Sequence, residues 1–146
     1  MATASKTMKS VMKIANGLHV ALYRISGGKL AGEIANMPLL LITTTGRKSG
    51  KPPTNPVVYL RDGQDFLVAA SVGGMDWHPG WYFNLKSQPL ANIRVGAQTF
   101  DVKATITTGV ERDRLFERFK AASSNFEKYE KNTSRVIPVI RLTPHA

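Results

Sequence analysis

A chain of 146 residues is long enough for one domain with a buried core, and the absence of cysteine excludes a disulfide framework and thiolate chemistry. The net charge of +10 is concentrated in residues 1–60, which hold eight Lys and Arg side chains against the single acid Glu33. This positive half predicts an anionic partner, which is a polyanionic small molecule, an anionic lipid surface or nucleic acid.

Several functional classes are disfavoured by the residues that are present. The histidines His19, His78 and His145 lack metal-ligand spacing, so no metal site is predicted. No segment reaches the roughly 18 apolar residues of a membrane span, and the N-terminus lacks the apolar core of a secretory signal, so we expect a cytoplasmic protein. Nucleic acid is not an expected partner, because only Tyr23 and Tyr59 could stack bases in the basic half.

Residues 5–26 are predicted to form an amphipathic helix, and residues 1–35 are taken as this helix with its linker. Apolar side chains recur at spacings of three and four and share one stripe, which consists of Met8, Val11, Ala15, Leu18, Leu22 and Ile25. We expect this stripe to pack on the rest of the domain. The alternative is a peripheral position on the inner face of the cell membrane, since basic amphipathic helices also lie on anionic membranes.

Residues 36–146 are predicted to form one β-barrel domain. Extended segments are expected at 37–45, 54–60, 66–71, 93–95, 99–107 and 135–142, with a hairpin turn at 61–63. Helices are expected at 77–87 and 109–122, the second with a capping box of Thr108 and Glu111. Pro138 places the last strand at an edge or a bulge. Six short strands with three helices predict an α+β fold whose antiparallel sheet closes into a barrel.

The loop Gly46-Arg47-Lys48-Ser49-Gly50-Lys51 joins the first two predicted strands. Its cations, hydroxyl and flexible glycines can direct charged groups and backbone N–H groups at a polyanion. A solvated turn is the alternative interpretation. A Walker A phosphate loop is excluded, because Lys51 is followed by Pro52 and Pro53 rather than by Ser or Thr and a helix.

The blocks TTTGRKSGKPPTNPVVYL, LVAASVGG, HPGWYFNLKSQP and RVIPVIRL follow one another within residues 37–142. Together they resemble the deazaflavin-dependent nitroreductase family, which consists of split β-barrel reductases that use coenzyme F-420. The resemblance implies a six-stranded antiparallel split β-barrel of the FMN-binding type. It also implies a deazaflavin joined through ribitol and phosphate to an oligoglutamate tail, whose negative charges suit the basic loop. Each charge-assisted bond to that tail would contribute about 1.5–3 kcal/mol.

The resemblance also assigns residues to the site. The expected cofactor-binding residues are Arg47, Lys48 and Ser49 at the phosphate and tail, Asn55, Pro56, Val57 and Val58 beside the ring, Ala69, Ala70 and Ser71 as a small-residue wall, and Gly80, Trp81, Tyr82 and Asn84 on the short helix. The helix spacing of Trp81 and Tyr82 also fits simple core packing. Phe126 and Tyr129 are expected to contact the acceptor, and either Tyr129 or water would donate the proton. Well-known members carry basic side chains where this chain has Pro53 and Val72.

The function implied by the resemblance is transfer of hydride from reduced coenzyme F-420 to a small electron-poor acceptor, such as a quinone, a nitroaromatic or an α,β-unsaturated carbonyl. Such chemistry resides in the cofactor and needs no catalytic triad, carboxylate dyad or metal. One alternative is an FMN-dependent split-barrel oxidoreductase, although the surplus of cations at 47–51 exceeds what one phosphate requires. Another alternative is a non-catalytic basic module that binds a membrane or nucleic acid.

Overall fold

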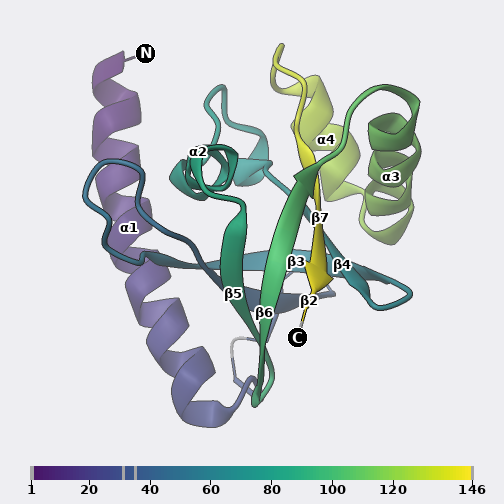
Figure 1. Cartoon of the computed structure of the whole chain (residues 1–146). Helices are drawn as coiled ribbons and strands as arrows, with labels where there is room; N and C mark the ends of the chain where they lie inside the picture. The colour runs from purple at the N-terminus through teal and green to yellow at the C-terminus, as the bar shows by residue number, and fades with distance from the viewer. Residues whose placement is uncertain (1, 31, 35, 146) are drawn as a thin grey trace.

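The computed structural model describes residues 2–30, 32–34 and 36–145, with side chains described for residues 7–30, 32, 33 and 36–145 (Figure 1). The elements in chain order are α1 (Ala2–Ser26), β1 (Glu33–Ile34), β2 (Met37–Thr43), β3 (Thr54–Asp62), β4 (Asp65–Ala69), the 3-10 turn η1 (Val72–Gly74), α2 (Gly80–Ser87), β5 (Leu90–Val95), β6 (Gln98–Ile106), α3 (Gly109–Ala122), α4 (Asn125–Lys131) and β7 (Val139–Pro144).

The strands form a closed antiparallel barrel. Their order is β1-β2-β3-β4-β7-β6-β5, and an additional pairing of β2 with β5 closes the ring. Strands β2–β7 therefore make the six-stranded barrel, and β1 is a two-residue extension paired with β2. The predicted α+β fold with a split antiparallel barrel is confirmed. The structure adds α4, a helix that the sequence pattern did not predict.

Strands β2 and β4 are buried on both faces. In β2, Leu40 and Ile42 point into the barrel, whereas Leu39 and Leu41 pack under α1. In β4 the inward positions alternate in the same way with outward positions that α3 and α4 cover. This double burial explains why both strands read as continuous apolar runs in the sequence.

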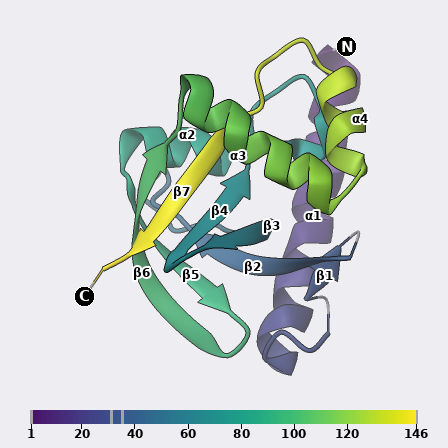
Figure 2. The same ribbon diagram turned by 90° about the vertical axis from the view of Figure 1, so that its right-hand side faces the viewer.

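The other helices cover separate parts of the barrel. Trp81 and Leu85 of α2 belong to the core inside the barrel, so α2 closes one of its ends. Helices α3 and α4 lie over one outer side, and α1 runs along another (Figure 2). Phe119 and Phe126 anchor this α3–α4 pair through ring centroids 5.1 Å apart.

Helix α1 is attached chiefly through its C-terminal half. The Tyr23 hydroxyl donates to the Leu39 carbonyl (3.1 Å) and accepts from the Gly96 N–H (2.7 Å), and Val20 is buried beside it.

The expectation that the apolar stripe packs on the domain is wrong. Its members Met8, Val11, Ala15, Leu18, Leu22 and Ile25 are all exposed. The barrel instead meets the face that carries Val20 and Tyr23. Of the eight Lys and Arg side chains in residues 1–60, that of Lys6 lies outside the described residues.

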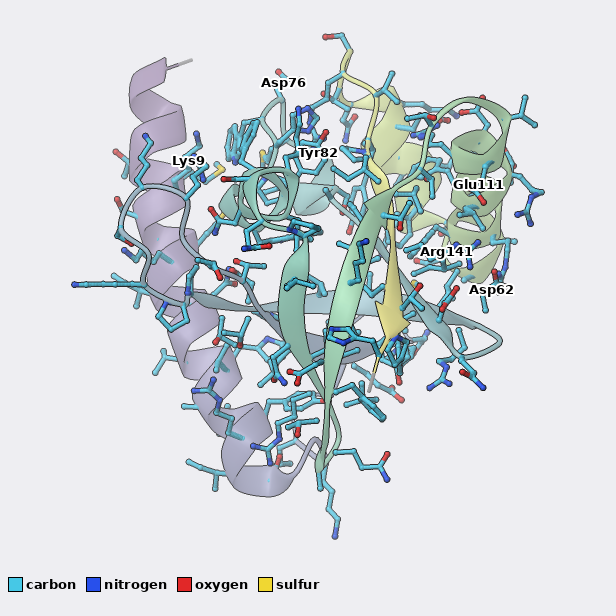
Figure 3. All side chains as sticks on the ribbon, in the orientation of Figure 1. Lys9, Asp62, Asp76, Tyr82, Glu111 and Arg141 are labelled. Carbon is cyan, nitrogen blue, oxygen red and sulfur yellow. The ribbon has the colours of Figure 1, made fainter. Side chains whose placement is uncertain are left out.

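Two local predictions also fail. The Thr108 side chain makes no capping hydrogen bond with any described residue, because Gly109 adopts φ 58° and the first turn does not have capping-box geometry. Glu111 lies 3.7 Å from Arg141 instead, in a group that also includes Asp62 (Figure 3). Pro138 is neither at an edge nor in a bulge, since it precedes β7, which lies between β4 and β6.

Candidate functional site

A cavity of about 910 Å³ lies between α1, β3, η1, α2 and α4. This volume is within the range of sites that hold a small-molecule ligand or cofactor. The cavity brings together most of the site residues expected from the sequence, namely Arg47, Asn55, Pro56, Val57, Val58, Ala69, Ser71, Gly80, Trp81, Asn84, Phe126 and Tyr129.

Four expected cofactor-binding residues do not line this cavity. Lys48 and Ser49 are exposed on the basic loop, where the Ser49 hydroxyl accepts from the Lys51 N–H (3.1 Å) and so stabilises the turn. Ala70 is fully buried in the barrel core. Tyr82 is buried there too, and its ring centroid lies 4.7 Å from that of His78. A direct role of these four in ligand binding stays a prediction.

The basic loop is held against α2 by one buried amide. Asn84 Oδ1 accepts from the backbone N–H of Arg47 (3.1 Å) and from Arg47 Nη1 (3.1 Å). Asn84 Nδ2 donates to the Thr44 hydroxyl (3.0 Å), so both ends of the amide are used. Arg47 Nη1 also lies 3.4 Å from the Gly80 carbonyl. These contacts fix one guanidinium at the cavity wall, where a charge-assisted bond to an anion becomes available.

The η1 segment contributes a strained piece of wall. Val72 has φ 46°, a left-handed conformation that costs a β-branched residue about 1–3 kcal/mol. Arg135 holds the segment by donating to the Ser71 carbonyl (2.8 Å) and the Met75 carbonyl (2.9 Å). Gly74 packs so closely on Tyr129 that an added Cβ would lie 2.8 Å from its Cα. The strain is therefore stabilised by contacts from the C-terminal part of the chain.

His78 also lines the cavity, although no role was expected for it from the sequence. Arg135 Nη1 lies 2.9 Å from His78 Nδ1, and because arginine can only donate, Nδ1 must accept and the ring proton must sit on Nε2. Burial lowers the pKa of His78 below its ordinary 6.5, and the charges of Arg135 and Lys86 lower it further. The imidazole is thus kept neutral. The only sequence signal was its place in the HPGWYFNLKSQP block.

Helix α4 brings Phe126 and Tyr129 to the cavity. Their ring centroids are 5.3 Å apart. Phe126 is 3% exposed and packs mainly in the cluster under α3, whereas Tyr129 is half-buried. Of these two side chains, only the Tyr129 phenol can exchange a proton with a bound molecule.

Helix α1 forms another wall that sequence reasoning missed. Lys9, Met12, Lys13 and Asn16 line the cavity, and their spacing of three and four places them on one face. Lys9 Nζ lies 4.8 Å from the ring centroid of Trp77. Figure 3 shows Lys9 on the side of α1 that faces α2.

The cavity is electropositive. Its Lys and Arg lining side chains are Lys9, Lys13 and Arg47, and among the described side chains that line it there is no Asp or Glu. Within the described part of the chain, no group of His, Asp and Glu side chains comes together that could hold a metal ion. An apolar, partly aromatic cavity with several cations is suited to a flat ring that carries an anionic arm.

The sequence matches the family described as F420H(2)-dependent quinone reductase over residues 16–144. This chain belongs to that family. It is 40% identical over 130 residues to the F420H(2)-dependent quinone reductase Rv1261c of Mycobacterium tuberculosis, covering 86% of this chain and 87% of that protein.

Two solved structures are also similar. One, of an F420-H2 dependent reductase (FDR-A), has a TM-score of 0.66 at 34% identity and covers 72% of this chain and 93% of that chain. The other is described as a domain-swapped dimer and has a TM-score of 0.67 at 27% identity, covering 96% of this chain and 98% of that chain.

Family membership decides between the functions that the sequence left open. The protein is an oxidoreductase whose cofactor is coenzyme F-420, and the FMN-dependent and non-catalytic alternatives are set aside. The cavity is compatible with the size and negative charge of this cofactor, because its volume is about 910 Å³ and its charged lining side chains, among those described, are all cations. When bound in reduced form, the deazaflavin supplies a hydride to an electron-poor organic acceptor.

Proposed function

We propose that the acceptor is a quinone dissolved in a membrane, and that the enzyme meets it with α1 lying on an anionic bilayer. The observation that carries this proposal is the outward face of α1. Its large apolar side chains are 41–85% exposed, and they are Met8, Val11, Ile14, Leu18, Leu22 and Ile25. Over the described residues, no helix has the length and apolarity needed to cross a membrane, so the contact would be peripheral.

The energetics favour an interface over water for this face. Burying a Val, Leu, Ile or Met side chain fully contributes about 1.5–3 kcal/mol, and partial insertion of several such side chains gives a fraction of that for each. A basic residue near an anionic surface adds about 1 kcal/mol. Arg24 and Lys29 are exposed at the C-terminal end of α1 and can supply this second term.

Within the cavity, each group of residues has a separate task in this proposal. The Arg47–Asn84 pair and the Asn55–Val58 segment hold the cofactor, with Lys48 and Ser49 at the entrance. Tyr129 lies at the acceptor. Reduction of a quinone to a quinol takes one hydride and one proton, and the Tyr129 phenol donates that proton and recovers it from water.

The test compares two acceptors under anaerobic conditions with reduced coenzyme F-420. One is a short, water-soluble quinone, and the other is a long-tailed quinone in anionic liposomes. Substitution of Val11, Leu18 and Leu22 by Ser should leave turnover of the soluble quinone unchanged and reduce turnover of the liposomal quinone at least tenfold. Co-sedimentation with the liposomes should fall in parallel.

A matched control removes exposed apolar side chains elsewhere. Val110 and Val136 are 84% and 68% exposed and lie away from α1, and their replacement by Ser should leave both turnovers unchanged. Equal turnover of the liposomal quinone by the α1 variant and the wild type would contradict the membrane part of the proposal. If the wild type reduces neither quinone, the acceptor is of another class.

A further inference from the structure

Helix α1 has the reverse of the usual arrangement of a surface helix. A helix that packs on a domain normally turns its apolar side inward and its charged side to solvent. Over its N-terminal half, α1 instead turns Lys9, Met12, Lys13 and Asn16 toward the cavity. Its large apolar side chains point outward, as the exposure of Val11 shows. The inward face is therefore suited to a polar, anionic ligand rather than to the barrel.

Among the described residues, no acidic side chain neutralises either lysine. Lys9 and Lys13 form no salt bridge with any Asp or Glu among the described residues. At a spacing of four residues they lie one above the other on the same face. Two unpaired cations at the wall of one cavity repel each other and gain from any anion placed between them and the opposite wall.

Lys9 and Arg47 each lie over an aromatic ring at the wall of this cavity. Lys9 lies over Trp77 at 4.8 Å, and Arg47 lies over Phe83 at 5.1 Å. His78 also lines the cavity, and its ring centroid is 5.6 Å from that of Phe83. Because Arg47, these rings and the two lysines all line one cavity, an extended anionic group that starts at Arg47 can reach α1.

We infer that Lys9 and Lys13 bind the anionic arm of coenzyme F-420, so that α1 is a wall of the cofactor site as well as a surface helix. This inference rests on the assignment of the cavity to that cofactor. Well-known family members carry basic side chains at the positions of Pro53 and Val72, and both residues line this cavity. Lys9 and Lys13 would supply the cations that these two positions lack here. The ligand chemistry recognised is phosphate or carboxylate, and the ring portion of the cofactor is not part of this contact.

The test is a fluorescence titration of the full chain with coenzyme F-420 and with its ribityl-deazaflavin fragment, which lacks the phosphate and the glutamate tail. Lys9→Ala with Lys13→Ala should raise the Kd for coenzyme F-420 at least tenfold and leave the Kd for the fragment within twofold. Lys9→Arg with Lys13→Arg should restore most of the affinity. The control Lys29→Ala with Lys103→Ala removes the same charge from exposed positions outside this cavity and should change neither Kd.

Two outcomes overturn the inference. One is an unchanged Kd for coenzyme F-420 in the double alanine variant. The other is an equal loss for cofactor and fragment, which would mean that the lysines only support the fold of the wall. A wild-type chain that fails to bind coenzyme F-420 would be a different result, since it would remove the cofactor assignment itself and the inference with it.

Discussion

Asn84 is the residue whose replacement most directly tests how the basic loop is positioned. Its amide makes two hydrogen bonds with Arg47 and one with Thr44, each 3.0–3.1 Å long. Asn84→Ala removes all three. A neutral bond contributes about 0.5–1.5 kcal/mol and a charged one about 1.5–3 kcal/mol, but water can replace Asn84 at the exposed Arg47. We therefore expect a loss of about 2–4 kcal/mol in the free energy of unfolding.

The same change should weaken cofactor binding. At about 3–4 °C for each kcal/mol in a chain of this size, Tm should fall by roughly 6–16 °C. Without Asn84 the Arg47 side chain is free to move, so it loses more conformational entropy when it binds an anion. The Kd for coenzyme F-420 should therefore rise about tenfold, which corresponds to about 1.4 kcal/mol of binding free energy. Thermal unfolding followed by circular dichroism and a fluorescence titration measure the two effects separately.

Asn84→Asp is the matched variant that separates the two effects. The carboxylate has nearly the same shape and accepts both Arg47 donors, and the Thr44 hydroxyl can turn to donate to it. Tm should then fall much less than in Asn84→Ala. The carboxylate also neutralises Arg47, so the affinity for coenzyme F-420 should still drop about tenfold. Wild-type affinity in Asn84→Asp, or wild-type Tm in Asn84→Ala, would refute this account of the loop.

Three further predictions concern other contacts. Tyr129→Phe should lower kcat with a quinone at least tenfold and leave the Kd of the cofactor unchanged, and an unaltered kcat would make water the proton donor. Tyr23→Phe should cost about 1–3 kcal/mol in unfolding free energy, because it removes the buried bond to the Leu39 carbonyl and the partly buried bond from the Gly96 N–H; an unchanged Tm would contradict this. Hydrogen bonding to Arg141 lowers the pKa of Asp62 below its ordinary 3.8, so the stability that Asp62 contributes is present above that pH and is lost as pH falls through the lowered value. Arg141→Met should weaken this acid dependence in unfolding experiments, and the same dependence in both proteins would show that another carboxylate carries it.

Much of the barrel could be predicted because its signals are local. Alternating or continuous apolar runs between turn residues indicate the strands, and Gly63 adopts φ 63° in the turn where Asp-Gly predicts a hairpin. Helix α4 gives no such signal. It has seven residues and buries a single side chain, Phe126, so the helical period hardly repeats within it.

The site was only partly predictable for a related reason. The basic loop and the residues after Pro79 stand in recognisable sequence blocks, and the structure places Arg47 beside Asn84 as a consequence of the barrel. The contact between His78 and Arg135 joins residues 57 positions apart. Nothing in the local pattern of either residue signals a partner, so only the tertiary fold could show that Arg135 fixes both the His78 tautomer and the strained Val72.

The failed prediction for α1 shows what periodicity can and cannot tell. Spacings of three and four establish that one side of a helix is apolar, but they do not say what covers that side. In α1 the C-terminal half is held by Tyr23 and Val20, which lie off the stripe, and the two hydrogen bonds of the buried Tyr23 hydroxyl help to orient the helix. Once Tyr23 faces the barrel, helical geometry turns Lys9 and Lys13 toward the cavity and the stripe toward solvent. The position of one side chain therefore links the proposed lipid contact on one face of α1 to the proposed cofactor contact on the other.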